Sequence, residues 1–73
     1  PKQILLLNVD QIYYNAFEGI DHLEFVSIPG SVKHILGYAF KDCKNLKRVI
    51  IQDGVQGIGY YAFYGCSSLE DIT

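Results

Sequence analysis

The sequence predicts a mostly β protein of the α/β class: a right-handed solenoid of three 23-residue repeats, each contributing one strand to a parallel sheet. Two observations support this prediction. The dipeptide Ala-Phe occurs at residues 16–17, 39–40 and 62–63, so the spacing between copies is 23 residues both times. Apolar residues return at the same spacing, and self-similarity at a fixed period of about 20 to 50 residues is the signature of a repeat architecture.

Superposing the chain on itself at this spacing keeps every apolar column apolar. A unit of this size cannot bury its apolar face alone, so the core is predicted to be a stack of like residues shared between neighbours. We therefore expect a single segment over residues 1–73, with repeats at about residues 5–27, 28–50 and 51–73. The columns are Leu5, Ile28 and Ile51; Val9, Val32 and Val55; Ile12, Ile35 and Ile58; Ile20, Cys43 and Cys66; Leu23, Leu46 and Leu69; and Val26, Val49 and Ile72.

Each repeat is predicted to contain one strand of the parallel sheet. Residues 46–51 have the spacing L-x-x-V-x-I, in which alternate residues lie on opposite faces of a strand. Strands are therefore expected near Phe25–Ile28 and Arg48–Ile51. In this arrangement Val26 and Val49 share the face that points to the core.

Turn signals follow each predicted strand. They are Pro29-Gly30-Ser31 in the second repeat and Asp53-Gly54 in the third. A short extended piece is expected after each turn, at residues 32–35 and 55–58. Residues 38–43 are too few for a long helix, and we interpret them as one helical turn that returns the chain to the next strand.

The second and third repeats carry a specific motif. Residues 28–35 read IPGSVKHI, residues 37–46 read GYAFKDCKNL, and residues 58–69 read IGYYAFYGCSSL. This combination resembles the BspA-like leucine-rich repeat of bacterial and protist surface proteins, and the resemblance covers the whole chain. The first copy departs from the motif, because Leu6-Leu7 stand where the Pro-Gly turn should be and Ile20 occupies the cysteine column.

The resemblance carries expectations about shape and location. It implies a curved solenoid with the parallel sheet on its concave side. It also implies membership of a longer surface-exposed or secreted protein that mediates attachment, and an extracellular or cell-surface location is expected from the resemblance alone. A chain that begins at Pro1 and contains no methionine is likewise expected to be a piece of something longer.

Charge and hydropathy limit the partners. The net charge is −2, and the basic residues cluster only at Lys41, Lys44, Lys47 and Arg48, which predicts no nucleic-acid partner. No stretch approaches the roughly 20 apolar residues of a membrane span. Acidic residues occupy the positions in the neighbouring repeats that match these basic residues. Unlike charges should therefore stack on a solvated face, with each ion pair worth about 0.2–1 kcal/mol. The alternative is that the basic residues form a binding site for an acidic ligand. These acidic residues are Glu18, Asp21, Glu24, Glu70 and Asp71.

The sequence predicts no catalytic residue, metal or cofactor. Cys43 and Cys66 share the core column of Ile20, which favours free thiols that pack as small apolar residues; a disulfide is the alternative in a secreted protein. His22 and His34 fall in different columns and give no metal framework. Catalysis needs unlike groups within hydrogen-bond reach, whereas columns of like residues do not bring such groups together.

Two surfaces are candidates for ligand binding. The first is the concave strand face, which carries Phe25, Arg48, Ile50, Ser27 and Asp71 and is predicted to bind a protein or peptide, with host surface or matrix proteins as candidates. The alternative is an aromatic surface of Tyr38, Tyr61 and Tyr64, in which Tyr38 is expected to stack over Tyr61.

Two further interpretations concern the whole segment. It could instead be a passive structural spacer that displays another domain. The open solenoid ends, at residues 2–7 and 70–73, are predicted to self-associate because each leaves an unpaired strand.

Overall fold

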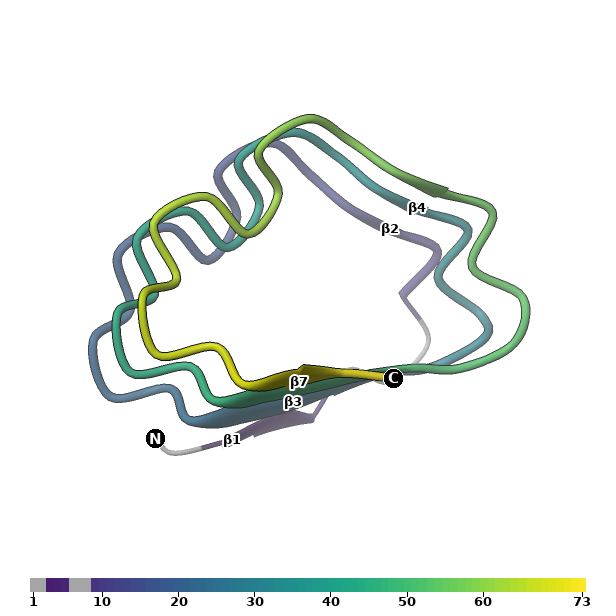
Figure 1. The fold of residues 1–73 in the computed structure, drawn as a ribbon. Coiled ribbons are helices and arrows are strands. Elements are labelled where there is room, and N and C mark those ends of the chain that lie inside the picture. Colours follow the sequence, from purple (N-terminus) through teal and green to yellow (C-terminus); the bar gives the residue numbers. More distant parts are fainter. Residues whose placement is uncertain (1–2, 6–8) are drawn as a thin grey trace.

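The computed structural model describes residues 3–5 and 9–73, which form short strands joined by turns (Figure 1). The described residues contain no helix, so the expected helical turn, and with it the α component of the prediction, is wrong. None of these residues therefore forms a helix long and apolar enough to cross a membrane. The strands are β1 (Gln3–Leu5), β2 (Gln11–Ile12), β3 (Phe25–Ile28), β4 (His34–Ile35), β5 (Arg48–Ile51), β6 (Gly57–Ile58) and β7 (Asp71–Ile72).

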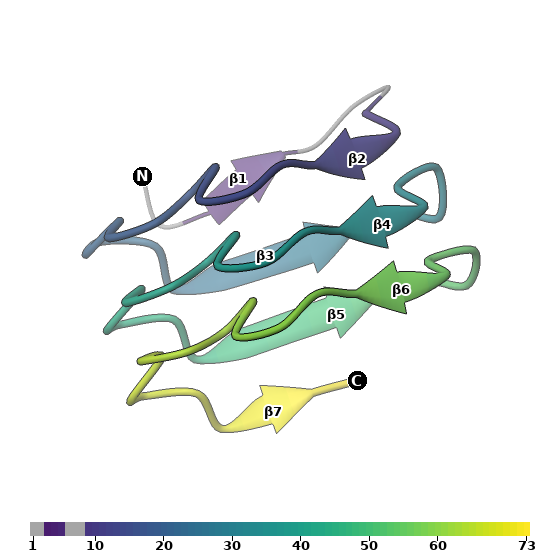
Figure 2. The same ribbon diagram turned by 90° about the horizontal axis from the view of Figure 1, so that it is seen from above.

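The strands form two parallel sheets. One has four strands in the order β1-β3-β5-β7, and the other has three in the order β2-β4-β6. Figure 2 shows the two sheets as separate layers, with the chain passing from one to the other and back between successive strands. The register pairs Phe25 with Arg48 and Arg48 with Asp71, so paired residues are 23 positions apart. The strands predicted near Phe25–Ile28 and Arg48–Ile51 are confirmed as β3 and β5.

The first strand does not follow this spacing. Gln3 pairs with Phe25 and Leu5 with Ser27, which is a spacing of 22. Because the next strand returns to 23, with Gln11 opposite His34, the stretch from Leu5 to Gln11 is one residue shorter than the stretch between their partners, Ser27 and His34. The alignment of Leu5 with Ile28 is therefore wrong, because Leu5 pairs with Ser27. The irregular turn expected at Leu6-Leu7 lies outside the described residues.

Close contact between neighbouring turns explains the glycines that follow β3 and β5. A Cβ on Gly30 would clash with the carbonyl oxygen of Asp53, and Gly54 has a φ of 112°, which only glycine adopts without strain. The amide of Val32 donates to the carbonyl of Pro29 at 3.0 Å and closes the first turn. The two predicted turns are confirmed.

Left-handed residues prevent a helix in the segment around Ala-Phe. Tyr38 and Asp42 have φ values of 61° and 60°, and Tyr61 has 55°. Backbone donors therefore bond across to the next segment; for example, the Phe40 amide reaches the Ala62 carbonyl at 2.7 Å. The sequence supplies the residues of a turn, but neighbouring chain rather than the local segment satisfies much of its hydrogen bonding.

The core lies between the two sheets and consists of stacked columns. Val26 and Val49 are fully buried on the same face, as predicted. Phe40 stacks between Phe17 and Phe63, with ring centroids 5.2 and 5.3 Å away. The other fully or nearly fully buried residues are Ile12, Leu23, Ile28, Val32, Ile35, Ala39, Cys43, Leu46 and Ala62.

Candidate functional site

The outer face of the four-stranded sheet carries a row of unlike side chains. Phe25, Arg48 and Asp71 are opposite one another on β3, β5 and β7. The Arg48 guanidinium carbon lies 5.8 Å from the centroid of the Phe25 ring, within cation–π range. On its other side, Arg48 Nε lies 3.8 Å from Asp71 Oδ2, and the Thr73 hydroxyl donates to Asp71 Oδ1 at 3.3 Å. The arginine is thus held between a ring and a carboxylate.

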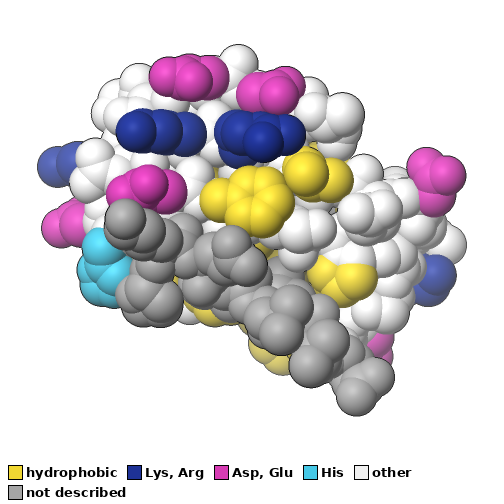
Figure 3. All heavy atoms as spheres, turned by 90° about the horizontal axis from the view of Figure 1, so that it is seen from below, with side chains coloured by type: hydrophobic (Ala, Val, Ile, Leu, Met, Phe, Trp, Pro, Cys, Tyr) yellow, Lys and Arg dark blue, Asp and Glu magenta, His cyan; other side chains and the backbone are white. Residues whose placement is uncertain are grey.

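A second row lies beside it on the same face. Ser27 pairs with Ile50, and both side chains are half-buried, as is Phe25. Figure 3 shows this face, where basic side chains lie directly beside hydrophobic ones and acidic side chains lie beyond them. The five predicted residues of this surface therefore occur together, although its apolar members are less exposed than the sequence suggested. We call Phe25, Ser27, Arg48, Ile50 and Asp71 the sheet-face patch.

Only part of the predicted charge ladder forms ion pairs. Besides Arg48 with Asp71, Lys41 Nζ lies 3.9 Å from Glu18 Oε2. No other Lys or Arg in the described part of the chain has a carboxylate within 4.0 Å. Both pairs are solvent-exposed, and such pairs contribute about 0–1 kcal/mol each.

The alternative aromatic surface also forms as a cluster. The Tyr38 and Tyr61 rings stack at 5.6 Å, as predicted, and Tyr64 meets Tyr61 edge-on at 5.3 Å. Lys41 Nζ lies 5.5 Å from the Tyr38 ring centroid. These four residues line a cleft of about 280 Å³, which we call the tyrosine cleft.

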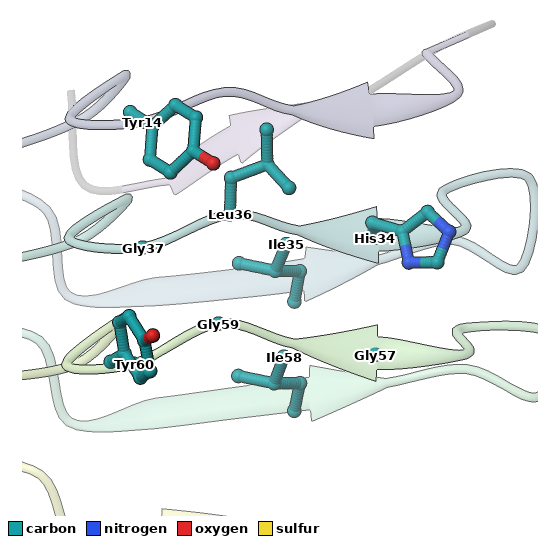
Figure 4. Close-up of a pocket in the computed structure, with 9 residues that line it drawn as sticks. All are labelled: Tyr14, His34, Ile35, Leu36, Gly37, Gly57, Ile58, Gly59 and Tyr60. Atoms are coloured by element: carbon teal, nitrogen blue, oxygen red, sulfur yellow. The ribbon is translucent and has the colours of Figure 1, made fainter.

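A larger groove, of about 400 Å³, lies over the three-stranded sheet (Figure 4). Sequence reasoning missed this site. The signal was a pair of glycines: Gly57 stands at the repeat position of Gln11 and His34, and Gly59 at the position of Tyr13 and Leu36. At both positions the first and second repeats carry a side chain, whereas the third repeat has glycine. We refer to the three-stranded sheet β2-β4-β6 as sheet B and call this site the sheet-B groove; its lining includes Tyr14, His34, Leu36, Gly57, Gly59 and Tyr60.

The two cysteines are free thiols that pack in the core column. Cys43 is fully buried and its Sγ donates to the Phe17 carbonyl at 3.1 Å, while Cys66 is half-buried and donates to the Phe40 carbonyl at 3.2 Å. Burial raises the pKa of the Cys43 thiol and that of the Cys66 thiol, the latter to about 11. Both thiols are therefore protonated and poor nucleophiles at neutral pH. Within the described residues, no three His, Cys, Asp or Glu side chains group closely enough to hold a metal ion.

Comparison with known proteins gives one match. The family model described as "BspA type Leucine rich repeat region (6 copies)" matches residues 4–73. No curated protein and no solved structure matches the chain.

Proposed function

Because the chain belongs to the BspA-type leucine-rich repeat family, whose repeats commonly bind proteins, we propose that it is a non-catalytic protein-binding or adhesion module. Its ligand is a protein or an extended peptide, with host surface and matrix proteins as the candidates. The sheet-face patch is the proposed site. The observation that carries this proposal is the in-register row of Phe25, Arg48 and Asp71 across three neighbouring strands.

The contacts of Arg48 suit this surface to recognition. Its guanidinium has five donors in a fixed plane, and the nearby Phe25 ring and Asp71 carboxylate restrict where that plane lies. Less side-chain entropy is then lost when a ligand binds. Phe25 and Ile50 add apolar area beside the charge, and an aromatic residue next to an arginine is typical of an interface hot spot.

We propose the rest of the architecture from the same features. The coil is a right-handed solenoid over residues 1–73, with repeats at about 5–27, 28–50 and 51–73 and the four-stranded sheet on its concave side. Support comes from the spacing of 23 between paired residues on β3, β5 and β7 and from the superposed turns in Figure 1. An extracellular or cell-surface location rests on the family resemblance alone.

Binding measurements test the proposed site. Phe25→Ala should weaken the affinity for a matrix-protein ligand by about 2 kcal/mol, whereas Glu18→Ala, whose side chain pairs with Lys41 on a solvated surface, should change it little. Isothermal titration calorimetry with host surface and matrix proteins gives the affinities, and circular dichroism checks that each variant folds.

The same experiment separates the alternatives. If wild type and Phe25→Ala bind equally while Tyr61→Ala binds more weakly, the site is the tyrosine cleft of Tyr38, Tyr61 and Tyr64. A passive spacer, by contrast, would bind none of these ligands, and no surface variant would change that result.

A further inference from the structure

The sheet-B groove lies on a different face from the sheet-face patch and has a different chemistry. Its floor is β6 and the residue after it, where Gly57 and Gly59 leave the backbone bare. In Figure 4, His34 lies at one end of the groove, the tyrosines Tyr14 and Tyr60 lie at the other, and Leu36 lies between. A volume of about 400 Å³ is within the range of about 300–1,000 Å³ that small-molecule sites occupy.

Different packing constraints apply to Gly57 and Gly59. A Cβ on Gly59 would lie 2.6 Å from the Gly37 nitrogen, so close packing of the backbone requires glycine there. A Cβ on Gly57 would meet only the His34 ring, at 3.3 Å, and Gly57 lies outside the left-handed region. Because a shift of the exposed His34 ring by a few tenths of an ångström would make room, packing does not require glycine at position 57, and Gln11 and His34 carry side chains at the matching positions.

Among the residues that the structure describes, those lining the groove include no Lys, Arg, Asp or Glu. Its polar side chains are the hydroxyls of Tyr14 and Tyr60 and the imidazole of His34. The two rings are 68% and 79% exposed, and the Tyr14 ring packs over Gly37, 3.6 Å from where a Cβ would stand. A charged ligand would lose hydration without meeting a countercharge, and a purely apolar one would bury these polar groups unpaired. A ligand with apolar C–H faces and neutral hydroxyl groups satisfies both conditions, and a sugar ring has that composition.

The surface continues beyond the groove. The Tyr60 ring lies 6.3 Å from the Tyr61 ring at an angle of 48°, and Tyr61 lines the tyrosine cleft. Aromatic rings thus extend from the groove to the second hollow without a break. A ligand of several linked rings could contact both hollows at once.

We infer that the sheet-B groove binds a neutral oligosaccharide, with one sugar ring over Gly57 between His34 and Tyr60 and the adjoining units passing over Tyr60 and Tyr61. The Tyr60 face supplies stacking, and the Tyr14, Tyr60 and His34 side chains exchange hydrogen bonds with sugar hydroxyls. The site is independent of the proposed protein-binding patch. The sugar could be a free polysaccharide segment or a glycan attached to a protein.

The test is an NMR titration of the ¹⁵N-labelled chain with the neutral hexasaccharides cellohexaose, chitohexaose and mannohexaose, up to about 10 mM because open sugar sites bind weakly. At least one sugar should shift the amide signals of His34, Gly57 and Gly59. Hexagalacturonate, which is negatively charged, and a proline-rich peptide are the comparison ligands. Ribonuclease B, which carries a neutral glycan, and its unglycosylated form ribonuclease A distinguish an attached glycan from a free one.

Variants locate the site. Tyr60→Ala removes the stacking face, and Gly57→Gln fills the floor with the residue found at the matching position of the first repeat; each should weaken binding about tenfold. Tyr60→Phe keeps the ring and should weaken it less, and Phe25→Ala on the other sheet should leave it unchanged. Circular dichroism confirms folding, and because Tyr60 is 79% exposed its replacement should not unfold the chain.

Three results would overturn the inference. The first is that no neutral sugar shifts the signals of the groove. The second is tighter binding of hexagalacturonate or of the peptide. The third is full affinity for the sugar in folded Gly57→Gln. None of these results bears on the sheet-face patch, whose ligand and variants are different.

Discussion

Replacing Leu46 by alanine measures how much the central column stabilises the fold. Leu46 is fully buried and lies in the column of Leu23, also fully buried, and Leu69, which is half-buried. Leu→Ala changes at buried sites cost about 2–5 kcal/mol, and neighbours above and below limit relaxation here, so we expect about 3 kcal/mol or more. The whole chain of 73 residues should have a stability of about 4–11 kcal/mol, so a loss of 3 kcal/mol would leave about 1–8 kcal/mol.

Leu69→Ala is the matched control. Both residues donate their amide to a carbonyl three residues earlier at 3.1 Å, so the local backbone is the same and only burial differs. Because Leu69 already contacts solvent, its loss should cost about 1–2 kcal/mol. Urea unfolding followed by circular dichroism gives both values; with a slope near 1 kcal/mol/M, a cost of 3 kcal/mol moves the midpoint by about 3 M. A loss below about 0.5 kcal/mol for Leu46→Ala, or a larger loss for Leu69→Ala, would refute this description of the core.

Two other properties of the chain can be tested in the same way. Burial raises the pKa of the Cys66 thiol to about 11, so the folded state holds the thiol proton more tightly than the unfolded state does. The contribution of this thiol to stability should therefore be complete below its ordinary pKa of 9.0 and lost as the pH rises toward about 11. Cys66→Ala should remove this part of the pH dependence of urea unfolding, and an unchanged pH profile in the variant would contradict the prediction. The 73-residue polypeptide by itself should self-associate through the edges of its sheet, because Ile72 on the edge strand β7 is 52% exposed. Light scattering should show this association, and Ile72→Lys should reduce it. A stable monomer at high concentration would exclude self-association.

Periodicity predicted most of the sheet that carries the candidate patch. The columns gave the pairing of Val26 with Val49 and of Phe25 with Arg48, because equal turn lengths keep equal spacing. The same reasoning failed at β1, where the stretch between the paired residues Leu5 and Gln11 is one residue shorter than that between Ser27 and His34. A column alignment without gaps has no means of detecting such a difference, since Leu, Ile and Val are acceptable at either register.

The helical turn could not be distinguished from the observed structure by composition. Tyr38, Ala39 and Phe40 suit a helical turn, but left-handed residues such as Tyr38 and Asp42 direct the backbone donors to the adjoining segment. That arrangement depends on a neighbour at hydrogen-bond distance, which only tertiary structure supplies. The stack of Tyr38 on Tyr61, by contrast, was predictable, because residues at the same position of adjacent repeats lie next to each other in a repeat protein.

The sheet-B groove illustrates what column reasoning leaves out. A core column must keep its size, because a smaller residue leaves a cavity that neighbours cannot fill. An outward column has no such constraint, and Gly57 can replace a glutamine or a histidine without disturbing the residues beneath it. The surface that results is set by which side chains are missing as much as by which are present. Variants in the outward columns should therefore change ligand binding while leaving unfolding nearly unchanged, whereas variants such as Leu46→Ala should do the reverse, and measuring both properties on one set of proteins separates recognition from folding.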